Sequence, residues 1–229
     1  MRSSNVGSIK IAKMIGEERL KKFYKDLEIF DKIEFELEEI GKPLPIKWGK
    51  CTLETASYGH GVTTTPLQLA KAYAILVNGG LKINPTLIKS KPKNEKKQQV
   101  VSEYTSLQIK NMLRKVVSTK EGTAKFADIS GYDIAGKTGT ADKYNSDELR
   151  NTFISFFPHK NPKYLLVVLL DEPKAAPNYV YTFGYLNNYK SSGYKKNTAG
   201  WNAALITGKI IEKIGPILAI NNLHASVNF

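Results

Sequence analysis

Six consecutive residues combine the side chains needed to hold an anionic ligand: Gly136-Lys137-Thr138-Gly139-Thr140-Ala141. Lys137 supplies a positive charge, and the hydroxyls of Thr138 and Thr140 can hydrogen-bond an anionic group. Gly139 has no side chain, so a ligand can approach the backbone there. A backbone N–H at such a point can also face a developing oxyanion. We expect a strand that borders a pocket; the structural alternative is a Lys-Thr-Gly turn on a solvated strand.

A second, weaker pattern is Ser-x-Asn, which pairs a hydroxyl with a carboxamide. It occurs twice, at Ser3-Ser4-Asn5 and at Ser226-Val227-Asn228. The pattern is too short to be specific, and only its order relative to the Lys-Thr-Gly segment favours the first copy.

Composition excludes several classes of site. The net charge is +13, but the basic residues are spread out, and their one dense run, at 91–97, contains Pro92 and Glu95. A solvated loop explains this run better than a nucleic-acid surface does, so we expect no nucleic-acid partner. The single cysteine, Cys51, and three scattered histidines show no metal-ligand spacing. We expect neither a metal nor a cofactor.

The first 130 residues are predicted to be mainly helical. Apolar residues recur at helical spacing over 3–30, with a break near Gly16, and 31–60 looks irregular. A helix over 65–77 has the clearest boundaries, because Thr65 and Gln68 form a capping box, Pro66 suits the first turn and Asn78-Gly79-Gly80 ends it. A second helix is expected over 104–117.

From residue 131 onward the pattern predicts strands and a closing helix. Strands are expected at 132–141, 152–157 and 164–170, the last two joined as a hairpin through 158–163. Residues 171–198 are predicted to form a long loop. An amphipathic helix is then expected over 199–220. Its predicted inward residues are Trp201, Leu205, Ile206, Ile210, Ile211 and Ile214.

Together these motifs resemble the penicillin-binding proteins and class A β-lactamases, whose set is S-x-x-K, S-x-N and K-T-G. The resemblance is closest to the class B penicillin-binding proteins, the septal cell-division transpeptidases, and covers most of residues 3–216. It rests on Tyr58-Gly59-His60-Gly61-Val62, Thr65-Pro66-Leu67-Gln68-Leu69-Ala70, Asn78-Gly79-Gly80, Glu121-Gly122-Thr123-Ala124, Ser155-Phe156-Phe157-Pro158, Asp171-Glu172-Pro173 and Ala199-Gly200-Trp201-Asn202-Ala203-Ala204.

The resemblance implies an α+β fold, the penicillin-binding/β-lactamase-like transpeptidase fold, with an antiparallel sheet and helices on both faces. It implies that 1–229 is a partial transpeptidase domain from which two N-terminal strands are missing. Residues 1–130 would form its mainly helical part, and 131–229 would supply sheet strands and the closing helix. By the same resemblance, Ser3 relays a proton, Asn5 orients the substrate amide and Lys137 holds the site's charge. Thr138, Gly139 and Thr140 bind substrate, with the Thr140 N–H forming half of an oxyanion hole.

The sequence departs from the family at the nucleophile. The family serine lies in an S-x-x-K upstream of S-x-N, whereas only two residues precede Ser3 here. Two such strings, starting at Ser90 and Ser192, lie downstream in expected loops and are interpreted as coincidences, because serine and lysine must share one face of a helix. We therefore expect a fragment of a serine-type D,D-transpeptidase that carries no nucleophile and is inactive alone.

The partners implied are peptidoglycan stem peptides, β-lactams and, in the family, cell-division proteins, at the periplasmic face of the bacterial inner membrane. The sequence itself shows no signal peptide and no run of 18 apolar residues that could anchor it. Two alternatives stay open: a β-lactamase or antibiotic-sensor relative, against which 65–70 argues, and a non-catalytic remnant that binds division partners or peptidoglycan.

Overall fold

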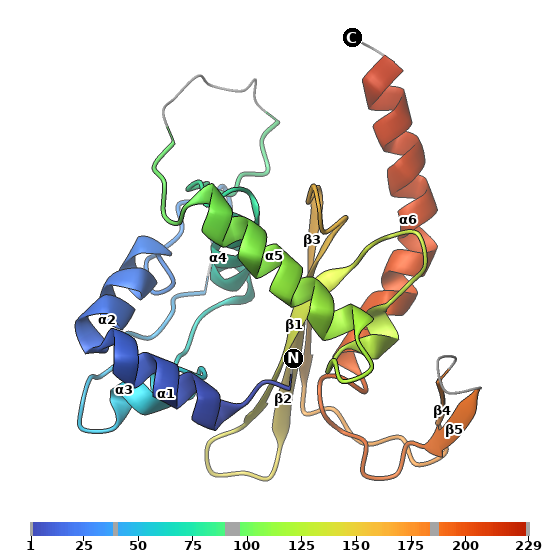
Figure 1. Cartoon of the computed structure of the whole chain (residues 1–229), viewed down its shortest axis with the longest axis horizontal. Coiled ribbons are helices and arrows are strands. Elements are labelled where there is room, and N and C mark those ends of the chain that lie inside the picture. Colours follow the sequence, from blue (N-terminus) through green and yellow to red (C-terminus); the bar gives the residue numbers. More distant parts are fainter. Residues whose placement is uncertain (1, 39–40, 90–96, 184–187, 228–229) are drawn as a thin grey trace. The chain divides into compact units, whose positions relative to one another are not determined.

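The computed structural model describes residues 2–38, 41–89, 97–183 and 188–227, with side chains of the last helix described up to residue 221. The chain divides into two compact units. Unit 1 comprises 1–112 and 160–165, and unit 2 comprises 113–159 and 166–229. Figure 1 traces the elements along the chain, and each unit is described by itself.

Unit 1 begins with two helices separated by a glycine, as the sequence predicted. Helix α1 (Asn5–Ile15) is capped by Ser4, whose Oγ accepts from the Gly7 N–H at 3.1 Å. Gly16 then adopts a φ of +83°, a conformation that favours glycine, and α2 (Glu17–Asp26) follows. The stretch predicted to be irregular contains one short helix, α3 (Thr52–Ala56).

Helix α4 (Pro66–Val77) has the predicted capping box. The Thr65 Oγ1 accepts from the Gln68 N–H at 3.2 Å, and the Gln68 side chain accepts in return from the Thr65 N–H. Gln68 is buried, and its Nε2 donates to the Asp31 carbonyl at 2.7 Å. Ala72 and Ile75 of α4 pack with Leu27 and Ile29 in a buried apolar cluster. The capping box therefore also ties α4 to the segment that follows α2.

A group of three charged residues lies beside this cluster. Lys71 of α4 forms an ion pair with Glu28, and Lys82 pairs with the other carboxylate oxygen of Glu28. The Lys71 side chain is only 5% exposed and that of Glu28 is 21% exposed. Burial alone would raise the pKa of the Glu28 carboxyl, but hydrogen bonds from the two lysines outweigh it and hold that pKa below its ordinary value.

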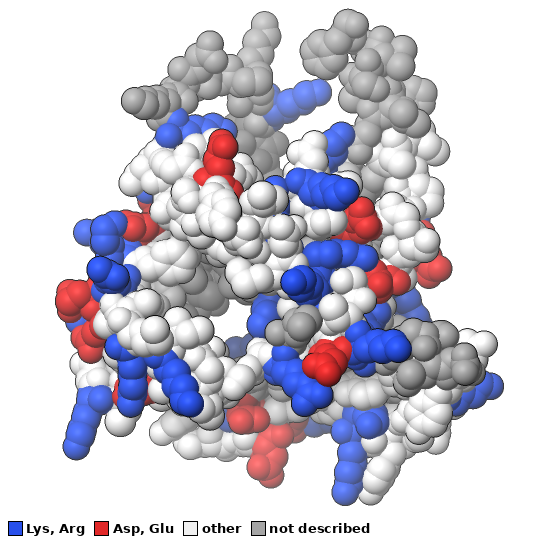
Figure 2. All heavy atoms as spheres, in the orientation of Figure 1, with Lys and Arg blue, Asp and Glu red and all other residues white. Residues whose placement is uncertain are grey.

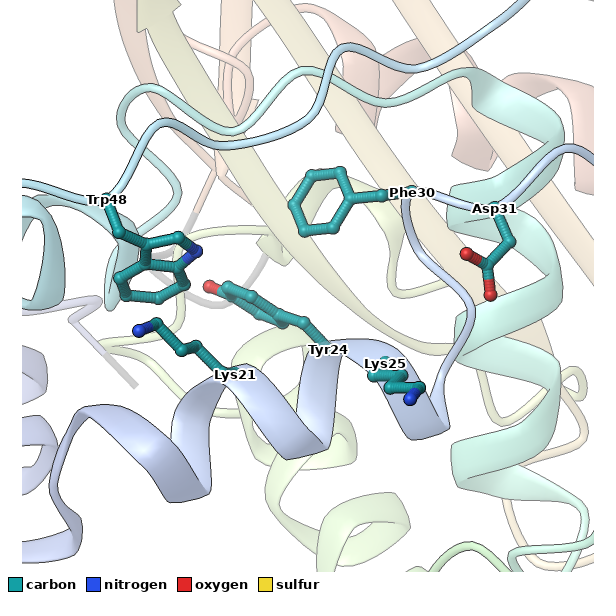
Figure 3. A pocket seen from close by; sticks show the side chains of 6 residues that line it. All are labelled: Lys21, Tyr24, Lys25, Phe30, Asp31 and Trp48. Carbon is teal, nitrogen blue, oxygen red and sulfur yellow. The ribbon is translucent and has the colours of Figure 1, made fainter.

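Three aromatic side chains line a small pocket of unit 1 beside α2 (Figure 3). The Lys21 ammonium lies 4.9 Å from the Trp48 ring centroid, and the Tyr24 hydroxyl donates to the Ala56 carbonyl at 2.7 Å. Tyr24 and Phe30 meet edge to face, with ring centroids 5.7 Å apart. The contacts of Lys21 with Trp48 and of Tyr24 with Ala56 attach α2 to α3 and to the segment before it.

Helix α5 (Glu103–Ser118) runs from unit 1 into unit 2 and lies close to the prediction of 104–117. Unit 2 continues with the short 3₁₀ helix η1 (Lys125–Ala127) and then the sheet. Its strands are β1 (Ala135–Asp142), β2 (Leu149–Phe157) and β3 (Tyr164–Asp171), in the order β1-β2-β3. The three predicted strands are confirmed, although β2 begins three residues earlier than expected.

The prediction of an unbroken loop at 171–198 was wrong. Within it, β4 (Val180–Phe183) and β5 (Tyr189–Ser192) pair as an antiparallel ribbon. Tyr181 and Phe183 of β4 are buried against Phe126 and Trp201, with ring centroids 4.9–5.8 Å apart. This aromatic packing stabilises a ribbon whose strands are only four residues long.

The closing helix α6 (Ala203–Val227) starts four residues later than predicted. Residues 199–202 form a turn instead, and the Asn202 Oδ1 accepts from the N–H of Ala203, the first residue of the helix, at 2.7 Å. Ile211 is fully buried as expected, whereas Ile214, predicted to face inward, is exposed. Among the residues described, no helix is long and apolar enough to cross a membrane.

The charge of the molecule is dispersed on the face shown in Figure 2. Lys and Arg side chains are scattered there, with Asp and Glu side chains between them. Several acidic residues are paired with lysines, such as Glu148 with Lys174 at 2.6 Å. Over the part of the chain that the structure covers, no group of three or more His, Cys, Asp or Glu residues is placed to hold a metal ion.

Candidate functional site

The Lys-Thr-Gly segment lies on β1, at one edge of the three-stranded sheet. β1 pairs antiparallel with β2, and no other described strand lies on its second side. Burial decreases along the strand: Ala135 and Gly136 are buried, Lys137 and Thr138 are half-buried, and Gly139 is exposed. The first half of β1 is thus anchored in the core of unit 2, while its second half presents an open strand edge.

The two glycines of this segment have different surroundings. A Cβ at Gly136 would overlap the Ile154 carbonyl and lie 2.8 Å from Cζ of Phe153, so this position cannot hold a larger residue without displacing β2. A Cβ at Gly139 would meet nothing closer than the Thr152 carbonyl at 3.9 Å. Gly139 therefore leaves open space beside the backbone, as the sequence predicted.

Lys137 is the cationic residue of the strand. Its Nζ donates to the Thr138 carbonyl at 2.6 Å. Burial lowers the pKa of the Lys137 ammonium below its ordinary value. A partly desolvated ammonium interacts more strongly with an anion than a fully hydrated one does, because less water screens the pair.

The hydroxyls of Thr138 and Thr140 are engaged by neighbouring segments of unit 2. Thr138 and Thr140 are two residues apart, so their side chains lie on one face of β1, and that of Lys137 lies on the other. The Oγ1 atoms of Thr138 and Thr123 are 2.7 Å apart, a hydrogen bond in which either can donate. The Thr140 Oγ1 accepts from the Ala199 N–H at 3.0 Å.

Ser3 and Asn5 lie together where α1 begins, in unit 1. Ser3 adopts a left-handed φ of +55° just ahead of the capping residue Ser4, and Asn5 is the first residue of the helix. Both are exposed. The structure thus groups the candidate residues in two sets, one at the start of α1 and one on β1. That the two sets face one cleft stays a prediction.

The downstream S-x-x-K string at 192–195 does not lie on a helix. Ser192 is the last residue of β5, and Lys195 has a φ of +57°. Its serine and lysine therefore do not share the helical face that a serine nucleophile and its lysine need. The string at 90–93 lies outside the described residues.

Five residues around β1 were not given a role from the sequence: Thr123, Asn151, Asn197, Ala199 and Asn202. They support the strand through hydrogen bonds that depend on tertiary packing. Thr123, Ala199 and Asn202 do fall in two of the segments that carry the family resemblance, and that was the available signal.

The comparisons with known proteins agree with the motifs. The family described as "Penicillin binding protein transpeptidase domain" matches residues 1–200. The chain is 34% identical to a probable peptidoglycan D,D-transpeptidase FtsI of Caulobacter vibrioides, over 95% of this chain and 37% of that protein. It is 36% identical to the stage V sporulation protein D of Bacillus subtilis, over 75% of this chain and 29% of that protein. The chain thus spans less than half the length of these relatives.

Solved structures show the same fold. The transpeptidase domain of Burkholderia pseudomallei penicillin-binding protein 3 superposes with a TM-score of 0.75 at 23% identity, over 93% of this chain and 62% of that one. A peptidoglycan glycosyltransferase from Burkholderia ambifaria gives a TM-score of 0.72 at 24% identity, over 93% and 61%. The expected α+β transpeptidase fold with its antiparallel sheet is therefore confirmed. This chain belongs to the penicillin-binding protein transpeptidase family, on its class B branch.

Proposed function

We propose that this chain forms part of the active site of a peptidoglycan D,D-transpeptidase, which cross-links stem peptides through an acyl-serine intermediate. The observation that carries the proposal is the geometry of β1. It combines a partly desolvated ammonium at Lys137, two threonine hydroxyls and an open backbone edge at Gly139. Such a strand suits a peptide substrate that ends in a carboxylate, because the edge pairs with the peptide backbone and the polar groups bind its charge.

The proposed reaction has two steps. A serine oxygen, supplied by an S-x-x-K element, forms an ester with the carbonyl of the penultimate D-alanine, and the terminal D-alanine leaves as the amine with its proton. An amine of a neighbouring stem peptide then attacks the ester, forms the cross-linking amide and restores the serine. Thr138 and Thr140 bind the substrate carboxylate, Lys137 supplies the positive charge of the site, and the Thr140 N–H supports the oxyanion. Ser3 relays a proton, and Asn5 orients the substrate amide.

The substrate implied by this chemistry is the D-alanyl-D-alanine end of a stem peptide, and a β-lactam would enter as its mimic. Cell-wall stem peptides are cross-linked outside the inner membrane, so the site is proposed to work at the periplasmic face. Association with cell-division proteins is proposed from the similarity to the Caulobacter relative alone.

A chimeric protein tests the proposal. The chain replaces the matching 37% of the Caulobacter relative, which supplies the remaining residues, and the purified chimera is incubated with fluorescent penicillin. We expect covalent labelling of the chimera, strongly reduced labelling of its Lys137→Ala variant and none of the 229 residues alone. Loss of a nucleophile typically costs on the order of 10⁶ in kcat, so the contrast is large.

Two results would refute the proposal. One is a folded chimera that stays unlabelled while the parent relative is labelled. The other is an adduct on the 229 residues alone, located by mass spectrometry to Ser192 or any other serine, because the chemistry would then use a different nucleophile.

A further inference from the structure

A buried asparagine lies directly behind Thr140. Asn151 of β2 is the register partner of Thr140, so the two side chains share one face of the sheet. Asn151 is fully buried, and its Nδ2 donates to the Asn197 carbonyl and to the Asn202 Oδ1, both at 3.1 Å. One carboxamide therefore holds both ends of the segment 197–202, which leads into α6.

The same segment is fixed from two other sides. Asn202 Oδ1 also accepts from the Ala203 N–H, and its Nδ2 donates to the Asn197 Oδ1 at 3.3 Å. A Cβ at Gly200 would overlap the Thr123 carbonyl, so the segment packs closely against the residue that hydrogen-bonds Thr138. These contacts leave little freedom for Ala199, which lies between them.

The position of Ala199 determines what the Thr140 hydroxyl can do. A hydroxyl has one proton to donate and two lone pairs that accept. Because the Ala199 N–H donates to Thr140 Oγ1, it occupies a lone pair and leaves the hydroxyl proton for another acceptor. A carboxylate is such an acceptor, and a hydrogen bond to a charged group is stronger than one between neutral groups.

We infer that Asn151 is a positioning residue: by holding 197–202, it orients the Thr140 hydroxyl as a donor to the carboxylate of the substrate. The inference rests on the proposed function for the identity of that carboxylate. Burying the Asn151 carboxamide also costs free energy, so filling space in the core does not by itself explain why an asparagine is found here. Its Oδ1 has no hydrogen-bond partner among the described residues, and an apolar side chain of similar size would avoid a buried, unsatisfied acceptor.

Three variants of the full chain separate positioning from simple stability. Asn151→Leu keeps the number and branching of the side-chain heavy atoms and removes both donors. Asn202→Asp keeps the oxygen that accepts from Asn151 and Ala203, loses only the 3.3 Å donation to the Asn197 Oδ1, and serves as the conservative variant. Ser155→Ala is the matched control, because Ser155 is also fully buried on β2 but its hydroxyl donates to the Leu166 carbonyl and not to 197–202.

The first readout is hydrogen exchange of the Ala199 amide, measured by NMR. In Asn151→Leu, loss of the two hydrogen bonds to 197–202 should weaken the bond from the Ala199 N–H to Thr140 and speed its exchange about five- to tenfold, while Asn202→Asp and Ser155→Ala stay near the parent rate. Unchanged exchange in Asn151→Leu would overturn the inference, whatever the protein binds. Equal acceleration in Ser155→Ala would also overturn it, since the effect would then be general destabilisation.

The second readout is the affinity for N-acetyl-D-alanyl-D-alanine against its C-terminal amide, which lacks the charge. The parent chain should prefer the free acid by about tenfold or more, Asn151→Leu should lose most of that preference, and the two other variants should keep it. If the parent shows no preference, the proposed function fails, and the exchange data still decide the role of Asn151. If Asn151→Leu keeps the full preference, the positioning role is wrong while the proposed function stands.

Discussion

At the scale of single residues, Gly136 and Gly139 are three positions apart on β1 but serve different needs. Gly136→Ala should destabilise unit 2 by about 1–3 kcal/mol, because its Cβ would press against the Ile154 carbonyl and the Phe153 ring. Gly139→Ala has room for its Cβ and should stay within about 1 kcal/mol of the parent while weakening binding of N-acetyl-D-alanyl-D-alanine. Urea unfolding and a binding titration measure the two effects. Equal loss of stability in both variants would contradict this distinction.

The protonation of Lys137 predicts how affinity for a carboxylate ligand depends on pH. Its ammonium attracts a carboxylate only while protonated, and burial lowers its pKa from the ordinary 10.5. Affinity for the acetylated dipeptide should therefore fall as the pH rises through this lowered pKa, and Lys137→Met should bind more weakly with no such decline. Calorimetry from pH 7 to 11 measures this. A parent profile as flat as that of Lys137→Met would contradict the prediction.

The lowered pKa of Lys137 also predicts how the free energy of unfolding depends on pH. The dependence is opposite to that of a lysine in a stabilising ion pair, whose pKa would be raised. Because the pKa is lower in the folded state than in the unfolded state, burying the protonated lysine costs stability at neutral pH. That cost is relieved as the pH rises through the folded-state pKa. Lys137→Met should accordingly be more stable than the parent at pH 7. Thermal unfolding at pH 7 measures the difference, and a lower midpoint for the variant would show that the hydrogen bond to the Thr138 carbonyl outweighs burial.

At the scale of elements, the capping box of α4 can be tested alone. Thr65→Ala removes the acceptor for the Gln68 N–H and should lower the free energy of unfolding by about 1 kcal/mol. The exposed neighbour Thr63→Ala is the control and should change it by less than about 0.5 kcal/mol. Urea unfolding followed by circular dichroism measures both. Equal effects in the two variants would show that the cap contributes nothing specific.

The elements found from the sequence are those specified by local signals. Helix α4 has its cap and its proline at its first residues and its terminating glycines directly after its last turn, so each boundary is marked locally. The break between α1 and α2 requires only Gly16. The ribbon β4–β5 was missed because its strands are only four residues long, too short to show a clear alternation, although Val180 to Phe183 are all strand-forming residue types. It forms when Tyr181 and Phe183 pack against Phe126 and Trp201, which are remote in sequence.

The candidate site was predictable to a similar extent. The motif predicted that Lys137 to Thr140 lie together on a strand, and β1 confirms that placement, while their roles in binding stay a prediction. The support from Asn151 could not be predicted, since an asparagine in a strand acquires that role only when the register places it opposite Thr140 and beside Asn202.

At the scale of the whole molecule, β3 forms the other edge of the described sheet. Its run Tyr164–Leu170 has no charge and no proline, and such an edge promotes pairing between molecules. We expect the 229 residues to self-associate in size-exclusion chromatography. Leu169→Lys should shift the population toward monomer, because Leu169 is 41% exposed and a charge there opposes edge pairing.

Leu87→Lys provides the matched control, because Leu87 is more exposed than Leu169 but lies outside the strands. A parent chain that elutes as a single monomer, or equal shifts in the two variants, would show that the β3 edge does not drive association.

The pairing of Glu28 with both Lys71 and Lys82 limits how this part of the protein can change over evolution. Replacing Glu28 alone would leave a buried ammonium without its counter-charge, whereas replacing Lys82 alone would leave Lys71 and Glu28 as a neutral pair. Loss of Glu28 should thus be tolerated only after, or together with, an apolar substitution at Lys71. Related chains should therefore rarely keep Lys71 after losing Glu28, whereas chains that keep Glu28 and Lys82 without Lys71 should be tolerated.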